Sequence, residues 1–494
     1  MSVKKELIGG LAYTAIAKYM GVVISFLITA VLSRLLSPDD FGIVAIATVL
    51  INFFSLLSDM GIGPAVVQNK TLDEVDHHHI FSFTIWIGIV LAVFFFLISP
   101  LISAYYKNEQ LLLICRLLSI NIMFVTWNIV PNALLYKNKM FKYLAYRNLV
   151  VQFIGGSLAI VGALNGLGIY ALLVNPIFTA VVMFFISLAR FPQKIYFSPR
   201  FASIKKIQSF SVYQFLFNLV NYLSRNLDKL VIGRVLGSRS LGYYEKSYRM
   251  MMLPLENITF VINPVMLPVF SEFQNDLNRL SSSYMKVVRT LAFVGSALTL
   301  LLFFAARELI LLIFGMQWEP SVDVFRILSL SVGIQIVLST AGSIFQAADS
   351  TKVMFYNSLI TIIINMTGLF ISIFFFGTIE AVACGILIAF TINFFVTYYT
   401  LFRFTFCNMK NLRCFFKQFI SPFCMGLIIA SILMFLMGMH IDSVFQNESL
   451  NLISGLLIKG LIILIGTALY IQLTREYDIW SKIRMYVNKK NRRK

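Results

Sequence analysis

The strongest constraint on the fold is an internal repeat, because two stretches 200 residues apart resemble each other closely. The first runs from 32 to 42 and the second from 232 to 242. Identical residues recur at one offset: Arg34 and Arg234, Leu36 and Leu236, Gly42 and Gly242, and further on Pro64 and Pro264. Each copy predicts an apolar helix, a short basic turn and a second apolar helix. Many transporters are built from a duplicated membrane-embedded half, with the substrate site between the halves.

The composition agrees with a chain that lies in a membrane. Hydrophobic residues make up 59% of the sequence, charged residues make up 13%, and the mean hydropathy is +0.82. A soluble domain has about 25% charged residues, which cover its surface. Many windows contain about 18 or more residues with almost no charge, enough to cross a hydrocarbon core of about 30 Å. We therefore expect an all-α integral membrane protein.

The apolar windows predict fourteen transmembrane spans. They lie at 8–32, 41–62, 80–102, 111–131, 146–165, 169–189, 209–233, 248–270, 287–314, 324–347, 353–376, 379–402, 415–438 and 451–473. The repeat groups the first twelve into two pseudo-symmetric lobes of six helices. The expected divisions are a lobe at 1–205, a second lobe at 206–405, two accessory helices at 406–474 and a basic cytoplasmic tail at 475–494. An even number of spans separates the copies, so an axis along the membrane normal should relate them.

The basic residues predict the orientation. A formal net charge of +19 would also suit a nucleic-acid-binding protein. With the N-terminus inside, however, Lys and Arg favour the cytoplasmic loops over the outer loops by roughly three to one, as in the positive-inside rule. We therefore expect both termini in the cytoplasm and no nucleic-acid partner. The outer loops are short, so the spans themselves must carry the function.

Candidate substrate-binding residues form one stripe on the predicted seventh span. They follow one another at steps of four, three, four, three and one: Gln214, Asn218, Asn221, Arg225, Asp228 and Lys229. These steps place them on one face of an α-helix. The first span has a matching stripe, in which Lys18 aligns with Asn218. A charge at mid-membrane costs about 2.5–3.5 kcal/mol on insertion scales, so such residues usually face a cavity or a partner.

Two explanations of these charges stay open. Arg225 and Asp228 are one helical turn apart and can neutralise each other, but this pair leaves Lys18 and Lys229 without a partner in the sequence. The alternative is a cavity lined by surplus cations, which suits an anionic amphiphile such as a lipid-linked phosphate or pyrophosphate. Arg249, at the outer start of the eighth span, is a further candidate at the mouth of that cavity.

The remaining embedded charges are less specific. Asp59 and Glu256 lie at nearly equivalent places in the two copies, and they are candidates either for binding a coupling ion or proton or for balancing the cations. A local ion pair is expected between Arg307 and Glu308. Lys459, in the last span, has no evident partner in the sequence.

The sequence indicates no metal site and no cofactor. The run at 73–79 reads Asp-Glu-Val-Asp-His-His-His and invites a metal interpretation. Adjacent histidines cannot all point one way, and a solvated inner loop explains the run equally well. No Gly-x-x-x-x-Gly-Lys-[Ser/Thr] loop occurs, which excludes ATP hydrolysis by that mechanism.

Three motifs carry a resemblance to a known family. Residues 34–45 read Arg-Leu-Leu-Ser-Pro-Asp-Asp-Phe-Gly-Ile-Val-Ala, and residues 59–68 read Asp-Met-Gly-Ile-Gly-Pro-Ala-Val-Val-Gln. The most specific motif, at 224–234, reads Ser-Arg-Asn-Leu-Asp-Lys-Leu-Val-Ile-Gly-Arg, and Leu-Gly-Tyr-Tyr follows at 241–244. The whole chain resembles the bacterial polysaccharide exporters of the Wzx type, in the branch named for colanic acid and teichuronic acid export.

The resemblance implies a fold and a function. The fold is that of the multidrug/oligosaccharidyl-lipid/polysaccharide superfamily, in which two six-helix lobes form a V around a central cavity that opens to each side in turn. The substrate would be an undecaprenyl-pyrophosphate-linked oligosaccharide, such as an O-antigen, capsule or exopolysaccharide repeat unit. It would be flipped across the bacterial cytoplasmic membrane. The motif at 224–234 puts Arg225, Asp228 and Lys229 at the cavity, and membrane lipids, a polysaccharide polymerase and a chain-length protein are expected partners.

Two other functional classes fit the sequence less well than the flippase. A drug/cation antiporter of the same superfamily should need an acidic anchor in the first lobe's cavity, where the first span offers Lys18. A membrane enzyme, such as a polysaccharide polymerase or ligase, generally needs a sizeable outer loop with basic and catalytic residues, whereas the outer loops here are short. We therefore expect a flippase that is not an enzyme.

Overall fold

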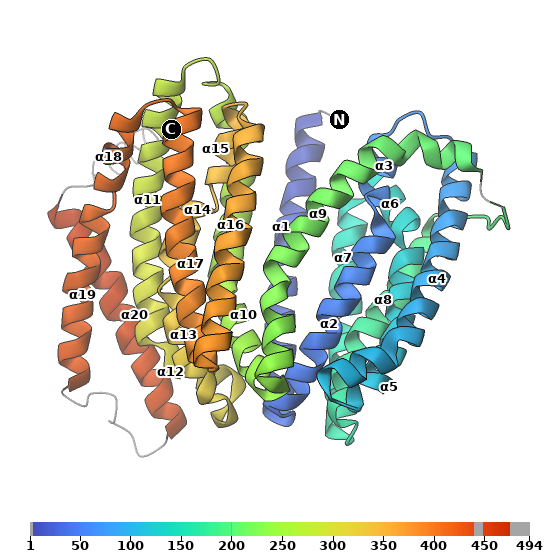
Figure 1. The fold of residues 1–494 in the computed structure, drawn as a ribbon, viewed down its shortest axis with the longest axis horizontal. Helices are drawn as coiled ribbons and strands as arrows, with labels where there is room; N and C mark the ends of the chain where they lie inside the picture. The colour runs from blue at the N-terminus through green and yellow to red at the C-terminus, as the bar shows by residue number, and fades with distance from the viewer. Residues whose placement is uncertain (1–2, 199, 439–447, 475–494) are drawn as a thin grey trace, which may run out of the picture. The chain divides into compact units, whose positions relative to one another are not determined.

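The computed structural model describes residues 3–198, 200–438 and 448–474, and these residues form helices with no strand among them. The described helices divide into two compact units, Met1–Glu245 and Lys246–Lys494 (Figure 1). The first unit contains α1 (Val3–Leu35), α2 (Pro38–Asp59), α3 (Ile62–Gln68), α4 (Glu74–Tyr106), α5 (Gln110–Trp127), α6 (Ile129–Lys137), α7 (Phe141–Leu164), η1 (Gly168–Tyr170), α8 (Ala171–Arg190) and α9 (Phe201–Val235). Helix α10 (Gly237–Ser271) begins in the first unit and continues into the second.

The second unit continues with shorter and more interrupted helices. They are α11 (Leu277–Phe304), α12 (Ala306–Phe314), η2 (Met316–Trp318), α13 (Pro320–Ser329), α14 (Val332–Leu338), α15 (Ala341–Ala347), α16 (Thr351–Ile371), η3 (Ser372–Phe376), α17 (Ile379–Thr400), η4 (Leu401–Thr405), α18 (Met409–Lys417), α19 (Ile420–Gly438) and α20 (Glu448–Leu473).

The prediction of an all-α, many-span membrane protein is confirmed. In the described part of the chain, twelve helical segments are long and apolar enough to cross a membrane. A pair bent by 44°, Pro320–Ser329 with Val332–Ala347, raises the number to thirteen. Helix α9 covers the remaining predicted span but is not among the thirteen. Much of α9 lies outside the residues whose side chains are described, so this span stays a prediction.

The boundary between the two compact units lies later in the sequence than the predicted boundary between the lobes. Helix α9 packs against α2, α3 and α4, so it belongs to the first unit although the repeat assigns it to the second lobe. Tyr222 of α9 donates its hydroxyl to the carbonyl oxygen of Val49 in α2, at 2.5 Å. The boundaries at 205, 405 and 474 stay predictions.

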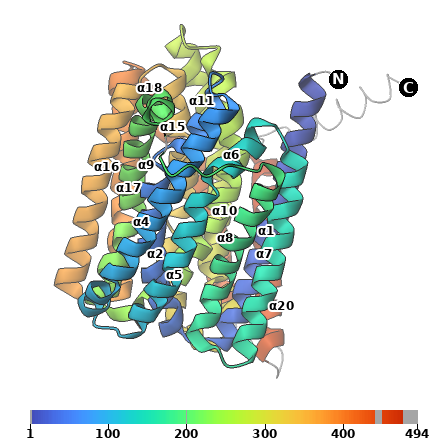
Figure 2. The same ribbon diagram turned by 90° about the vertical axis from the view of Figure 1, so that its right-hand side faces the viewer.

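The turn of the first repeat copy is also a helix start. Ser37 caps α2, because its hydroxyl accepts a hydrogen bond from the Asp40 amide at 3.2 Å and Asp40 accepts one from the Ser37 amide at 2.9 Å. Pro38 follows at the first helical position, where its missing N–H costs nothing. The Ser-Pro-Asp-Asp sequence therefore fixes where α2 begins, and α2 runs next to α5 in the view of Figure 2.

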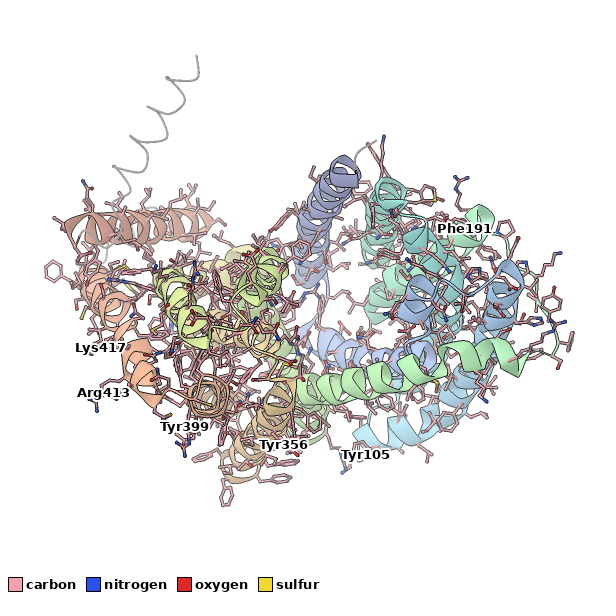
Figure 3. All side chains as sticks on the ribbon, turned by 90° about the horizontal axis from the view of Figure 1, so that it is seen from above. Tyr105, Phe191, Tyr356, Tyr399, Arg413 and Lys417 are labelled. Carbon is pink, nitrogen blue, oxygen red and sulfur yellow. The ribbon has the colours of Figure 1, made fainter. Side chains whose placement is uncertain are left out.

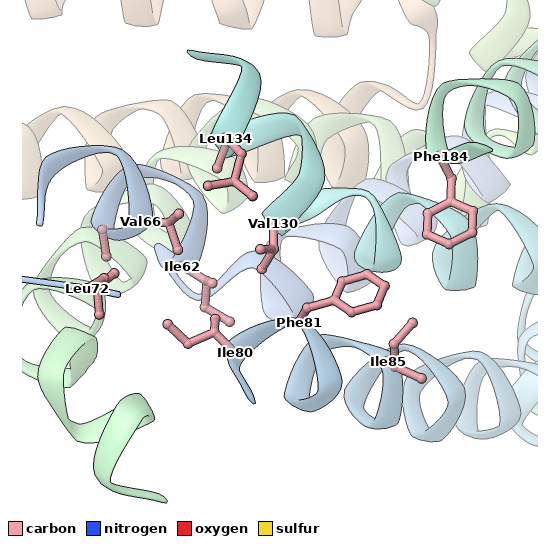
Figure 4. Packing of buried hydrophobic residues seen from close by; sticks show 11 residues of the cluster. Ile62, Val66, Leu72, Ile80, Phe81, Ile85, Val130, Leu134 and Phe184 are labelled. Atoms are coloured by element: carbon pink, nitrogen blue, oxygen red, sulfur yellow. The ribbon is translucent and has the colours of Figure 1, made fainter. Parts of the chain in front are cut away.

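Two helices of the first unit are broken at one depth of the bundle. Met60 and Gly61 take left-handed φ angles of 40° and 76° between α2 and α3, and Asn128 separates α5 from α6. The short helices α3 and α6 pack against each other in a hydrophobic cluster. Figure 4 shows Val66 and Val130 in this cluster, together with residues of α4 and Phe184 of α8.

In the second unit, a buried ion pair joins the last helix to α12. Lys459 Nζ of α20 lies 2.5 Å from Glu308 Oε1, and the two side chains are only 5% and 8% exposed. Arg307 pairs with Glu319, at 3.2 Å, and its expected pair with Glu308 stays a prediction. The separation in sequence between 308 and 459 explains why Lys459 had no evident partner.

The short helix α18 has one basic face and one apolar face. Lys410, Arg413 and Lys417 are exposed at steps of three and four, whereas Phe415 is buried. Figure 3 shows Arg413 and Lys417 at the periphery of the second unit, with their side chains pointing outward. Basic residues at the end of a span are typical of the cytoplasmic membrane surface.

Candidate functional site

The polar stripe predicted for the seventh span lies on α9, and the charged side chain of Arg225 in this stripe is exposed. The described residues give the Arg225 side chain no ion pair and no hydrogen bond. Asn218 and Asn221 lie in α9, but their side chains fall outside the described residues. An exposed guanidinium is available to a ligand, and its planar fork matches phosphate oxygens.

Asp228 bonds to a tyrosine of the next helix rather than to Arg225. The hydroxyl of Tyr244, in α10, donates a hydrogen bond of 2.6 Å to Asp228 Oδ2. Tyr244 is fully buried. The i to i+3 pairing of Arg225 with Asp228, one of the two explanations of these charges, is therefore not formed among the described side chains.

Lys229 also has a partner on α10. Its Nζ lies 2.9 Å from Glu245 Oε2, with the side chains 15% and 24% exposed. Two consecutive residues of α10, Tyr244 and Glu245, thus bind two consecutive residues of α9, Asp228 and Lys229. The Leu-Gly-Tyr-Tyr motif at 241–244 ends next to Glu245, so the sequence did mark this neighbourhood without assigning it a role.

The other predicted site residues are spread over two units. Lys18, in α1, is half-buried, and Asp59 ends α2. Arg249 and Glu256 are exposed residues of α10 and belong to the second unit. The structure thus brings Asp228 and Lys229 together with α10, whereas the roles assigned to Lys18, Arg249 and Glu256 stay predictions.

The first unit contains a cavity of about 1300 Å³, which we call the carboxamide cavity. It is lined by parts of α2, α3, α5, α6, α7 and α8 and by residues at the breaks between helices. Six asparagines line it: Asn52, Asn121, Asn128, Asn132, Asn148 and Asn175. Gln68 and Gln152 add two more carboxamides. The described lining includes no Lys and no Arg, and Asp59 is its one carboxylate.

Asp59 has a structural bond at the wall of this cavity. Its Oδ1 accepts a hydrogen bond from the Gly63 amide at 3.1 Å, just after the break that separates α2 from α3. A carboxylate at that position satisfies one of the free amides at the start of α3. Asp59 is therefore placed both to cap a broken helix and to present an acidic group to the cavity.

A buried arginine lies directly behind two of the asparagines. Arg147, 8% exposed, donates from Nη2 to Asn132 Oδ1 at 2.9 Å and to Asn148 Oδ1 at 3.1 Å, and from Nη1 to Ser187 Oγ at 2.7 Å. Its described hydrogen bonds all go to neutral acceptors. Buried charges are usually paired, so a guanidinium that holds only neutral groups is unusual.

This cavity was not predicted from the sequence, although the sequence contains a signal for it. The polar residues recur at helical spacing on neighbouring helices: Thr48, Asn52, Ser55 and Asp59 along α2, Asn121, Asn128 and Asn132 along α5 and α6, and Asn148 and Gln152 along α7. These steps of three, four and seven match the pattern that singled out α9. Neutral carboxamides are a weaker signal of a site than charges in the same apolar background.

The histidine run closes a loop of the first unit. His78 Nδ1 lies 2.9 Å from Gln193 Oε1, the His79 ring stacks on Tyr196 at 4.5 Å, and Asp76 accepts from Ser203 Oγ at 2.7 Å. The run therefore fastens the segment between α8 and α9 to the start of α4, which is a structural use of these side chains.

Comparison with known proteins gives a consistent assignment. A family model described as "Polysaccharide biosynthesis protein" matches residues 31–323. The lipopolysaccharide biosynthesis protein WzxC of Escherichia coli (strain K12) is 24% identical over 411 residues, which cover 82% of each chain.

Solved structures of transporters have the same fold. The lipid II flippase MurJ, in an inward closed conformation, matches with a TM-score of 0.70 at 17% identity and covers 93% of this chain and 98% of its own. An inward-facing multidrug resistance transporter of the MATE family in the MOP superfamily matches with a TM-score of 0.61 at 16% identity and covers 80% of this chain and 96% of its own. The chain thus has the fold of the MOP superfamily.

Proposed function

The chain belongs to the family of polysaccharide biosynthesis proteins, and on that premise we propose that it is a flippase for a lipid-linked oligosaccharide. Its substrate would be an undecaprenyl-pyrophosphate-linked repeat unit of an O-antigen, capsule or exopolysaccharide. The protein would carry this lipid across the bacterial cytoplasmic membrane by alternating access and would not act as an enzyme. Both termini would lie in the cytoplasm, and a polysaccharide polymerase and a chain-length protein would act on the product.

The observation that carries the proposal is the exposed guanidinium of Arg225 on α9, a helix that packs against the apolar spans α2 and α4. A diphosphate that crosses the membrane loses its hydration, and a fixed cation in a low-dielectric site offsets that loss better than a cation screened by water. Arg225 supplies two parallel N–H donors to a phosphate, which makes the contact both strong and directional. Lys229, held by Glu245 at 2.9 Å, keeps a second cation next to it.

Deletion and complementation test the proposal. A strain that lacks this gene should lose its surface polysaccharide and accumulate the lipid-linked repeat unit in the inner leaflet. A plasmid copy of the full chain should restore the surface polymer. Normal surface polysaccharide in the deletion strain, with no accumulated precursor, would overturn the proposal.

A drug/cation antiporter is the second candidate, and Asp59 is the observation that favours it. An antiporter needs an acidic anchor in the first lobe, and Asp59 is the one carboxylate of the described cavity lining. Under this hypothesis the deletion strain becomes sensitive to cationic drugs, and Asp59→Asn fails to restore resistance. Under the flippase hypothesis drug sensitivity is unchanged, so minimum inhibitory concentrations for ethidium and norfloxacin separate the two.

A further inference from the structure

We propose that the carboxamide cavity of the first unit binds the neutral sugars of the transported lipid, as a subsite apart from the cations of α9. This inference rests on the proposed function and divides the substrate between two places. The pyrophosphate is assigned to Arg225, and the saccharide to the cavity lined by Asn128, Asn132 and their neighbours.

The lining matches hydroxyl groups and does not match an anion. Each carboxamide offers two N–H donors and an acceptor oxygen, and each sugar hydroxyl both donates and accepts. No Lys or Arg is among the described lining residues, and Asp59 would repel a phosphate. A volume of about 1300 Å³ exceeds the usual range of about 300–1,000 Å³ for pockets that hold a small molecule. The cavity is therefore large enough for several sugar rings.

Arg147 sets the orientation of two carboxamides. Because it donates to Oδ1 of both Asn132 and Asn148, their Nδ2 groups are left as the free ends of the amides. No bond from either Nδ2 occurs among the described residues. Arg147 thus acts as a positioning residue, which makes donors of Asn132 and Asn148 without itself lining the cavity.

Other carboxamides present acceptors to the same space. Asn121 donates from Nδ2 to the carbonyl oxygen of Pro176 at 2.8 Å, so its Oδ1 is the free end. Asn128 Oδ1 is buried and has no hydrogen-bond partner among the described residues. A buried acceptor without a partner costs about 1–3 kcal/mol. A ligand hydroxyl that reached the break between α5 and α6 would satisfy this oxygen.

The duplicated half does not reproduce the lining, so the cavity is not a by-product of the repeat. At the offset of 200, Asn52 corresponds to Met252 and Ser55 to Leu255, while Asp59 corresponds to Thr259. Two polar positions of the α2 row are thus apolar in α10. The first copy alone has retained or acquired a row of hydrogen-bonding groups, which indicates a task particular to this unit.

Substitution of carboxamides that line the cavity tests the inference. Asn128→Leu and Asn132→Leu keep the side-chain size and remove the hydrogen bonds. Asn52→Leu makes the same change at an exposed position, where a substitution disturbs folding less. Asn165→Leu, beyond the far end of α7 and outside the lining, is the matched control. The probe is the lipid-free oligosaccharide released by mild acid from the precursor pool of the host strain. Binding to the full chain in nanodiscs is measured by saturation-transfer NMR.

The inference predicts a split between binding and export. The three cavity variants should lose oligosaccharide affinity by about tenfold, because a hydrogen bond lost between ligand and protein is worth about that much. They should also lose export at normal protein level, whereas Arg225→Ala should lose export and keep oligosaccharide binding. Wild-type affinity in Asn128→Leu, Asn132→Leu and Asn52→Leu would overturn the inference.

The outcomes also separate this inference from the proposed function. If the unaltered chain restores surface polysaccharide and the cavity variants restore it equally, the saccharide subsite is wrong and the flippase stands. If the unaltered chain restores nothing, the proposed function has failed first.

Discussion

Gly42, near the start of α2, packs against the start of α10, and Gly242, near the start of α10, packs against the start of α2 in the same way. A Cβ atom on Gly42 would lie 1.7 Å from the carbonyl oxygen of Ser238, and one on Gly242 would lie 2.0 Å from the carbonyl oxygen of Pro38. Because 38 corresponds to 238 and 42 to 242, the contact is symmetric about the two copies of the repeat. The Ser238 hydroxyl also donates to Asp39 Oδ1 across the same contact. The repeat is therefore a structural joint, in which the starts of α2 and α10 approach too closely for any side chain.

Replacement of either glycine should weaken this joint. Gly42→Ala and Gly242→Ala place a methyl group against backbone atoms, which cannot rotate away. We therefore expect the free energy of unfolding to fall by at least the about 1–3 kcal/mol that is typical of overpacking. The thermal unfolding midpoint of the purified protein, followed by tryptophan fluorescence, should fall clearly. Gly426→Ala is the control, because nothing lies within 4 Å of its added Cβ. Equal midpoints for Gly42→Ala and Gly426→Ala would contradict the close contact.

The sequence predicted what depends on local pattern and on the repeat. Apolar windows located the spans, because hydrophobicity is a local property. Partners distant in sequence were out of reach. The partner of Lys459 was not predicted because Glu308 is 151 residues away in the sequence. The partner of Lys229 was not predicted because Glu245 lies on the next helix.

The cavity escaped prediction for a different reason. Asn128 and Asn132 carry no charge, so in an apolar span they have the same appearance as residues that bond to their own helix. Their function as lining depends on how α2, α5, α7 and α8 pack, and no single helix pattern contains that information. The buried Arg147 bonds to Asn132 and Ser187, which are 15 and 40 residues away in the sequence.

The buried pair of α12 and α20 predicts a strong coupling between two residues. Lys459→Met leaves the Glu308 carboxylate buried without its cation, and breaking such a pair costs about 3–5 kcal/mol. We expect Lys459→Met and Glu308→Gln each to lower the unfolding midpoint in detergent. The double variant should recover most of the loss, since no isolated charge then remains. Additive losses in the double variant would show that the two side chains do not interact.

The orientation predicts which cysteines an impermeant maleimide can reach. With both termini in the cytoplasm, the turn between α4 and α5 at Asn108 faces outward, whereas Lys139 and Lys194 face inward. In a variant without native cysteines, Asn108→Cys should label in intact cells, and Lys139→Cys and Lys194→Cys should label only after permeabilisation. Labelling of Lys194→Cys in intact cells would reverse the topology. The turn at 440–449 and the tail at 475–494 are predicted to be outside and inside, but 439–447 and 475–494 lie outside the described residues.

Lys229 is predicted to serve the substrate and not only Glu245. Lys229→Ala should abolish export while the protein remains at its normal level in the membrane. The reversed pair, Lys229→Glu with Glu245→Lys, rebuilds the attraction between α9 and α10 but moves the cation to the other helix. We expect this double variant to fold and to remain inactive in the complementation assay. Restored surface polysaccharide would make the pair purely structural.

Arg225 is predicted to be the most sensitive position of α9. Its guanidinium has no described partner, so Arg225→Ala removes no internal bond and should leave stability unchanged, yet it should abolish export because the diphosphate loses its fixed cation. Arg225→Lys should retain partial export, since the charge stays and the bidentate fork is lost. Surface polysaccharide in the deletion strain, normalised to protein level on blots, is the measurement.

Two further variants decide between substrate binding and charge balance at Arg225. Tyr244→Phe removes the 2.6 Å hydrogen bond to Asp228 without touching Arg225, and it should retain most of the export. Arg279→Ala, at an exposed site at the start of α11, removes the same charge elsewhere and should be neutral. If Arg225 only balanced Asp228, the double variant Arg225→Ala with Asp228→Ala would regain activity. Because Asp228 bonds to Tyr244 instead, we expect no rescue, and rescue would remove Arg225 from the substrate site.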